Sequence, residues 1–409
     1  VALIILGAHQ TPRADARGVD GVEKARQHWS FKAPQRREAG KLKNPAWMTQ
    51  PLDAFVLARL ENANLSPNPT ADERMLKRRV SFDLIGLPPD SRQIAGDSYE
   101  EFVEQLLASP HFGERWARLW LDVARFAEDQ AHIVGNNASL TYPNAWMYRD
   151  WVIDAFNKDL PYNEFLRRQL AADLLFPDEK KEHPALGFMG LGPKYYRRGD
   201  LAVMADEWED RVDTLTRGVL GLTVACARCH DHFYDPIPSD DYYALAGVFA
   251  STEMFNHPLN EKDKGKNGQA GKPINASHIL REAKSMRNLP VYERGDVKSP
   301  GEEVPRGFLT VLASDGKRLE FNPGTSGRLD LAEALVSRDN PLTARVWVNR
   351  VWAELFRQPL VATPSNFGAL GENPTHPDLL DDLSVRFMEE GHWSLKWLVR
   401  EIVLSSTYR

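Results

Sequence analysis

Cysteine is scarce in this chain: its 409 residues include only Cys226 and Cys229. Two cysteines cannot form the network of disulfides that stabilises many small secreted domains. A disulfide between residues only three apart would also be strained as a structural bridge. What this pair of thiols does must therefore be inferred from the residues beside it.

Long apolar runs are missing as well. A membrane-spanning helix needs about 20 consecutive apolar residues, and the apolar start of the chain, "VALIILGA" at residues 1–8, is much shorter. This start is typical either of the end of a secretion signal or of a buried segment at a trimmed N-terminus. We expect the chain to begin as a processed or truncated product. We also expect any membrane association to involve this segment alone.

An excess of basic charge is absent too. The formal net charge is −6, and residues of both signs are interspersed along the chain. Because no broad basic surface is indicated, nucleic acid is not an expected partner. The sequence also lacks the Ser-His-Asp, P-loop, GxGxxG and HExxH patterns of common enzyme classes. Composition and motifs therefore do not decide whether the protein is an enzyme.

What the sequence does contain is apolar residues at three- and four-residue spacing, which predict helices. Proline breaks two of these patterns, at Ser109–Pro110 and at Pro161, because it ends a helix at the preceding residue. The aromatic residues on these stripes, such as Trp116 and Trp120, are expected in the core. The helical patterns cover residues 44–65, 71–89, 98–129, 147–176, 204–230 and 239–251, and they resume after Pro341.

These patterns predict a mainly α fold in four parts. An irregular lead covers residues 1–43, and a multi-helical domain covers residues 44–251. Residues 252–305 are charged and rich in glycine, which predicts a linker or surface excursion with a few short extended or β segments. A second helical domain covers residues 306–409, and we expect it to be incomplete at the C-terminus.

Both cysteines lie in the sequence "CARCH", residues 226–230. In a c-type haem site, each thiol adds to one vinyl group and the adjacent histidine binds the iron. The pattern therefore predicts one covalent haem c on Cys226 and Cys229, with His230 as the proximal iron ligand. A zinc site would need a second pair of ligands, and a redox dithiol is expected in a βαβ unit. Both remain as less favoured alternatives.

Other residues are candidates for the surroundings of this haem. His232, Arg228 and Arg217 lie close to the motif in the sequence. They are expected either to contact a haem propionate or simply to serve the turn and the end of the preceding helix. The sequence does not determine the sixth iron ligand. The candidates, each of which is better explained as an ordinary core or surface residue, are His132, Met204 and Met189.

A further group of polar residues lies on two neighbouring segments, "WLDVARFAED" and "YPNAWMYRDWVIDAF". Arginine–aspartate pairs beside aromatic residues are common structural ties in protein cores. The functional alternative is a polar pocket that faces the haem. The residues in question are Asp122, Arg125, Glu128, Tyr142, Asn144, Arg149 and Asp150.

At the level of longer motifs the chain resembles a known family. The segments "PLDAFVLARLE", "RRVSFDLIGLPP", "ASPHFGERWARLWLDVARFAE" and "LTVACARCHDHFYDPIPSDDYYALAGVFAST" are similar to the first domain of cytochrome c-associated proteins abundant in planctomycetes. The segments "NPLTARVWVNRVW", "LVATPSNFGALGENPTHPDLLDDL" and "WSLKWLVREIVLSSTYR" are similar to their second domain. The resemblance covers residues 28–409. It implies two consecutive domains of unknown function, the first of which carries the haem motif.

The resemblance also implies an exported protein of the periplasm or cell envelope. We expect an electron carrier with one haem and a redox partner protein, such as another cytochrome domain. A haem-dependent oxidoreductase with a substrate cleft in the helical body is an alternative, since a simple carrier needs only a small domain. A structural or interaction module that retains its haem is a third. The chain differs from longer family members because it has no second CxxCH motif upstream and ends inside the second domain.

Overall fold

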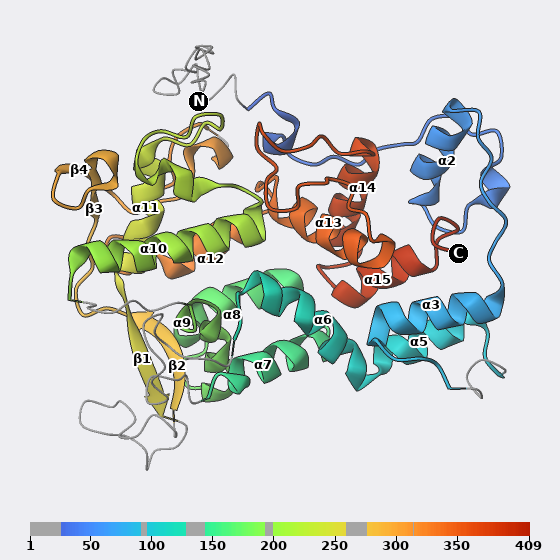
Figure 1. Ribbon diagram of the computed structural model, residues 1–409, viewed down its shortest axis with the longest axis horizontal. Helices are drawn as coiled ribbons and strands as arrows, with labels where there is room; N and C mark the ends of the chain where they lie inside the picture. Colours follow the sequence, from blue (N-terminus) through green and yellow to red (C-terminus); the bar gives the residue numbers. More distant parts are fainter. Residues whose placement is uncertain (1–25, 91–95, 128–143, 193–198, 259–275, 314) are drawn as a thin grey trace, which may run out of the picture.

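The computed structural model describes residues 26–90, 96–127, 144–192, 199–258, 276–313 and 315–409 (Figure 1). Helices hold about 53% of the residues and strands 7%, compared with roughly a third and a fifth in an average globular protein. The prediction of a mainly α fold is therefore confirmed. Among the helices of the described ranges, none is both long and apolar enough to cross a membrane.

The N-terminal half of the described chain is built from short amphipathic helices. The predicted break at Ser109–Pro110 is confirmed. The Ser109 hydroxyl accepts a hydrogen bond from the His111 backbone N–H, and Pro110 is the first residue of the next helix, an arrangement that both residue types favour. The helices are α2 (Asp53–Asn62), α3 (Glu73–Ile85), α5 (Tyr99–Ala108), α6 (Pro110–Val123), α7 (Trp146–Asn157) and α8 (Tyr162–Leu175), with 3₁₀ turns at Trp29–Phe31 and Pro45–Trp47.

The middle and C-terminal parts add two small antiparallel hairpins and further helices. The hairpins pair β1 (Thr252–Pro258) with β2 (Ala276–Glu282) and β3 (Leu289–Tyr292) with β4 (Pro300–Val304). The helices are α9 (Gly187–Gly190), α10 (Leu201–Leu215), α11 (Ser239–Ala250), α12 (Arg328–Val336), α13 (Thr343–Phe356), α14 (Pro377–Glu389) and α15 (Leu395–Val403), with 3₁₀ turns at Lys180–Leu186, Val224–Arg228, Glu293–Gly295 and Thr310–Leu312.

The described part of residues 252–305, which composition marks as a linker or surface excursion, packs onto the body of the protein. Phe255 on β1 and Ile279 on β2 are buried, and so are Leu289 and Tyr292 on β3. These side chains join the same hydrophobic cluster as the helices. The extended segments are therefore part of the core, and the β3–β4 hairpin is placed beside the cysteine motif.

The two predicted helical domains also share this core (Figure 1). Trp347 on α13 stacks on Tyr162 of α8, with ring centroids 4.3 Å apart, and lies edge-on to Trp120 of α6 at 6.0 Å. Arg328 on α12 is 1% exposed and pairs with Asp173 of α8 at 2.9 Å. These apolar and charged contacts join the domains into one packed unit.

The predicted continuous helix over residues 204–230 is wrong. Helix α10 ends at Leu215, and a π-helical turn, Thr216–Leu220, follows it. Gly221 then adopts left-handed geometry with φ +61°, and a Cβ atom there would lie 2.9 Å from the Phe367 ring. Glycine tolerates both the angle and the close approach, and it ends the helix. The cysteine motif consequently lies on a separate turn.

Candidate functional site

Cys226 lies on a 3₁₀ turn, Val224–Arg228, between α10 and α11, and Cys229 is the residue directly after it. A 3₁₀ helix has three residues per turn, so residues three apart share a face. Val224 and Ala227 form the buried face, whereas Cys226 and Cys229 are exposed and neither is in a disulfide. The local geometry therefore presents both thiols on one side of an anchored turn.

His230 follows directly and is exposed. Its Nδ1 lies 2.7 Å from the backbone carbonyl oxygen of Asp231. Because a carbonyl only accepts, Nδ1 donates in this hydrogen bond, so the lone pair of a neutral imidazole would be on Nε2. The ring also packs against Phe233, with centroids 4.1 Å apart. This contact engages Nδ1 within the protein and leaves Nε2 as the nitrogen that could bind a metal.

Both thiols and the imidazole line one open hollow of about 490 Å³. Its far wall is the turn of the β3–β4 hairpin, where Arg294 and Gly295 have φ values of +52° and +74°. A Cβ atom on Gly295 would lie 2.9 Å from the Cys229 sulfur. Glycine therefore keeps a space beside this thiol that any other residue would fill.

Arg228 and Arg217, the two arginines predicted near the haem, have separate roles. Burial alone would lower the pKa of the Arg228 guanidinium, but hydrogen bonds to Glu209 and Asp206 outweigh this and raise the pKa above its usual range. The charge of Arg228 is thereby neutralised by carboxylates of α10. Arg217 pairs with Asp213 at 2.6 Å and lines a different pocket.

His232 belongs to the turn. Its Nδ1 accepts from the backbone N–H of Asp235 at 2.9 Å, so Nε2 carries the proton and donates to the Thr223 hydroxyl, also at 2.9 Å. Burial lowers the pKa of His232, which keeps the ring neutral. Both ring nitrogens are engaged within the protein, and neither is available as an iron ligand in this geometry.

Of the candidate sixth ligands, the two that the structure describes, Met189 and Met204, do not line the hollow. His132 lies outside the described residues. Met189 is 2% exposed within the core, and Met204 packs against the core from α10. Of the described residues that line the hollow, His230 is the only histidine and none is a methionine.

The tail of the motif, "DHFYDPIP", connects the two domains. The Asp235 carboxylate accepts from the backbone N–H of Ala369 at 2.6 Å, and a side chain on Gly368 would collide with it. The carbonyl of Gly221 accepts from the Phe367 backbone N–H at 2.7 Å. Nothing in the sequence indicated these contacts, because the partners lie more than a hundred residues apart.

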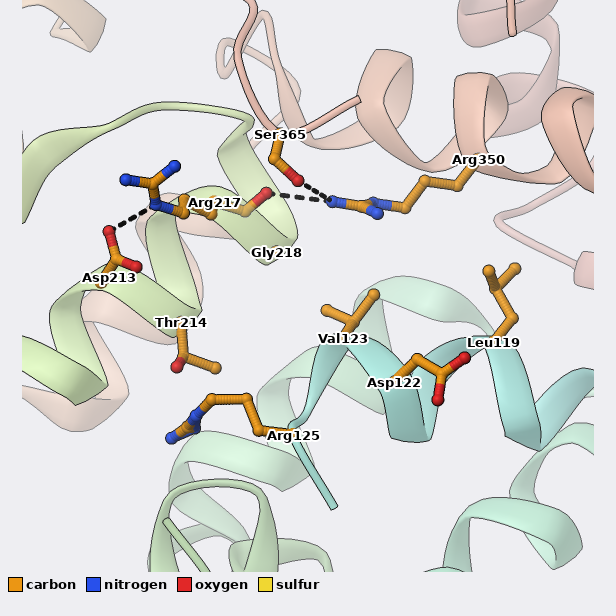
Figure 2. Close-up of a pocket in the computed structure, with 10 residues that line it drawn as sticks. All are labelled: Leu119, Asp122, Val123, Arg125, Asp213, Thr214, Arg217, Gly218, Arg350 and Ser365. Atoms are coloured by element: carbon orange, nitrogen blue, oxygen red, sulfur yellow. Dashed lines mark hydrogen bonds and ion pairs between the residues drawn. The ribbon is translucent and has the colours of Figure 1, made fainter. Parts of the chain in front are cut away.

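A second pocket, of about 320 Å³, lies where α6, the π-helical turn and α13 meet (Figure 2). Asp122 and Arg125 line it, as two members of the predicted polar group, and Arg125 pairs with Asp210 at 2.8 Å. The group does not assemble as a whole: Arg149 and Asp150 pair with each other on an exposed part of α7, and Glu128 and Tyr142 lie outside the described residues. Sequence reasoning missed two further lining residues, Arg350 and Ser365.

Comparison with known proteins agrees with a two-domain chain. Residues 51–254 match the family described as PSCyt2, protein of unknown function (DUF1549). Residues 327–409 match the family described as PSD1, protein of unknown function (DUF1553). No curated protein and no solved structure matches the chain. The chain therefore contains a DUF1549 domain, in which the cysteine turn lies, followed by a DUF1553 domain.

Proposed function

We propose that Cys226, Cys229 and His230 hold one covalent haem c and that the protein is an exported electron carrier. The observation that carries this proposal is the arrangement of three groups around one hollow. Two free, exposed thiols lie on and directly after a 3₁₀ turn, and the next residue offers the Nε2 of His230, whose Nδ1 is held by a backbone carbonyl. A zinc site is less well supported, because among the described residues no three His, Cys, Asp or Glu side chains are placed so that they could hold one metal ion.

The residues present fit the chemistry of attachment. Each thiol would add its S–H across a vinyl double bond of the haem, which forms a thioether and releases nothing. Asp231 would hold the imidazole of His230 through its carbonyl, and the missing side chain of Gly295 would leave room beside Cys229. A bound haem supplies one-electron redox chemistry.

The openness of the site supports a role in electron exchange. The cysteines and His230 are exposed, and so are the neighbouring aromatic residues Phe233 and Tyr234, at 64% and 57%. A haem attached here would keep an edge near the surface, where a redox partner protein can approach. Export to the periplasm or cell envelope belongs to the proposal, since the resemblance to exported haem proteins implies it.

A haem-dependent oxidoreductase is the second candidate function. The observation that favours it is the pocket at the meeting of α6, the π-helical turn and α13, which provides room for a small molecule (Figure 2). Carbon monoxide titration of the reduced protein separates the two candidates. A carrier has both axial positions filled by protein and does not bind carbon monoxide, whereas an oxidoreductase with an open position binds it.

The test of haem attachment is expression of the full chain in a bacterium that matures c-type cytochromes, followed by the pyridine haemochrome spectrum of the denatured protein. We expect one thioether-linked haem per chain. The double variant Cys226→Ser/Cys229→Ser should carry none. The variant Met204→Leu, changed away from the hollow, should carry as much as the unchanged protein. A chain that matures without covalent haem, while a control cytochrome in the same cells acquires its own, would refute the proposal.

A further inference from the structure

The pocket beside the π-helical turn combines two apolar side chains with several charged and polar ones (Figure 2). Leu119 and Val123 on α6 form an apolar wall, and Arg350 reaches in from α13. Each predicted domain contributes, α6 and the π-helical turn from the first and Arg350 and Ser365 from the second. Pockets at domain junctions with apolar walls and a few polar groups are typical places for small ligands.

Arg350 is the unusual group in this pocket. Its Nη2 donates to the carbonyl oxygens of Arg217 and Pro364 and to the Ser365 hydroxyl, at long distances of 3.1, 3.3 and 3.4 Å. Its Nε is buried without a hydrogen-bond partner. Among the described residues, no carboxylate lies within ion-pair distance of it. Burial accordingly lowers the pKa of the guanidinium.

Arg350 is half-buried, and the fully buried arginines have more or stronger partners. Arg345, on the same helix, pairs with Asp381 at 2.6 Å, and Arg386 pairs with Glu401 at 2.6 Å. Arg306 has no carboxylate partner and its Nε, like that of Arg350, lacks a hydrogen bond, but its other two nitrogens make three hydrogen bonds of 2.8 to 3.0 Å. A buried cation without a counter-charge is costly. Arg350 thus has unused hydrogen-bonding capacity that an anionic ligand would satisfy.

The backbone around the pocket is specialised as well. The turn Thr216–Leu220 is π-helical, a conformation that is rare and frequent at functional sites. It supplies the Arg217 carbonyl that Arg350 contacts. Gly218 allows this turn to approach α6, because a Cβ atom there would lie 2.7 Å from a Val123 methyl group. Arg125, on the opposite side, has a left-handed φ of +57°, which costs energy for a residue with a side chain.

We propose that this pocket binds a small organic anion, with its oxyanion group on Arg350 and its apolar part against Leu119 and Val123. A planar guanidinium matches the oxygens of a carboxylate or a phosphate, and both groups share the chemistry that the pocket offers. Asp122 lines the same pocket, so a second negative charge on the ligand is disfavoured. The site does not depend on haem, and its test uses the full chain whether or not haem is attached.

The test compares three probes of similar shape by isothermal titration calorimetry: benzoate, phenyl phosphate and the neutral benzamide. We expect benzoate or phenyl phosphate to bind with a Kd of about 1 mM or tighter, and benzamide to bind about tenfold more weakly. Whichever anion binds better identifies the oxyanion group. The absence of binding by both anions, or equal binding of benzamide, would overturn the proposal.

Substitutions test whether the anion binds at Arg350. Arg350→Gln should raise the Kd of the better-binding anion about tenfold. Arg338→Gln should leave this Kd unchanged, because Arg338 is a surface arginine paired with Glu389. Binding that survives Arg350→Gln in a folded protein would overturn the proposal. If that variant does not fold, methyl NMR of the unchanged protein decides: the resonances of Leu119 and Val123 must shift with the anion, and shifts confined to other methyl groups would place the ligand elsewhere.

Discussion

The cysteine hollow and the Arg350 pocket are built in different ways. The reactive groups of the hollow come from five consecutive residues, 226–230, at the end of a 3₁₀ turn and directly after it. The pocket is assembled from α6, the π-helical turn, α13 and the loop of Ser365, with lining residues as far apart as Leu119 and Ser365. Local chemistry can be recognised in a motif, whereas chemistry that needs the whole fold is visible only after the chain is folded. The predictions below test this contrast.

The largest expected effect concerns the core beneath the pocket. Trp347 is 1% exposed and stacks on Tyr162, so Trp347→Ala should reduce the free energy of unfolding by about 3–5 kcal/mol. Because the predicted domains share one core, we expect a single cooperative transition at lower denaturant concentration in chemical unfolding. Trp146→Ala, which changes a tryptophan that is 42% exposed, should have little effect. Two separate transitions would contradict the shared core.

A second prediction concerns Asp241 on α11, which follows the cysteine turn. Burial raises the pKa of this carboxyl from 3.8 to about 6, although hydrogen bonds from Thr310 partly oppose the shift. The folded pKa exceeds the unfolded one, so the contribution of Asp241 is fully present below about pH 4 and is lost as the pH rises through about 6. The change amounts to about 3 kcal/mol.

Unfolding free energies measured from pH 4 to pH 7 test this prediction. Asp241→Asn should remove most of that pH-dependent loss. Asp240→Asn, at the exposed neighbouring position, should retain it. An Asp241→Asn protein with the pH dependence of the unchanged chain would show that another group is responsible.

Substitutions of the two histidines of the motif should affect different properties, one the stability of the fold and the other the haem. His232 satisfies backbone and hydroxyl groups in its turn, so His232→Gln should cost about 1–3 kcal/mol of stability and leave the absorption spectrum of the haem unchanged. His230→Gln should change the absorption spectrum of the haem and leave the stability nearly unchanged, because His230 is exposed and supplies the proposed iron ligand. Thermal unfolding and visible spectra measure both effects. Equal behaviour of the two variants would contradict the assignment.

The smallest expected effect is at Gly295. An alanine there must adopt φ +74° and place its Cβ 2.9 Å from the Cys229 sulfur. We expect a loss of about 1–2 kcal/mol from the backbone angle and a lower yield of attached haem. Gly199→Ala is the matched control, because nothing lies within 4 Å of a Cβ atom there. Full haem yield in Gly295→Ala would show that the space beside Cys229 is not needed.

Sequence periodicity was sufficient for much of the fold. The apolar stripes predicted the helices and the break at Ser109–Pro110, because amphipathic spacing and proline act locally. The prediction of one helix over residues 204–230 was wrong because the helical path ends at Gly221. This glycine adopts a left-handed conformation and contacts Phe367. That contact is set by tertiary packing and leaves no periodic signal. The packing of β1–β4 against the helices also depends on tertiary contacts, so the sequence did not predict it.

The candidate sites show the same limit. The cysteines and His230 could be predicted because the chemistry requires them at fixed spacing. The separate role of His232 depended on hydrogen bonds within a turn, which spacing alone does not reveal. Arg350 could not be predicted, since an arginine on an apolar helix is expected to find a carboxylate, and its half-buried position without one is a property of the folded chain.

The most direct test of the central claim is peptide mapping by mass spectrometry of the full chain after cytochrome c maturation. The account predicts that the peptide containing residues 226–230 carries one haem through two thioether bonds, at Cys226 and Cys229. If that peptide is recovered with both thiols free, or joined only to each other, the haem assignment is contradicted. In the second case, the redox dithiol would be the better account of the site.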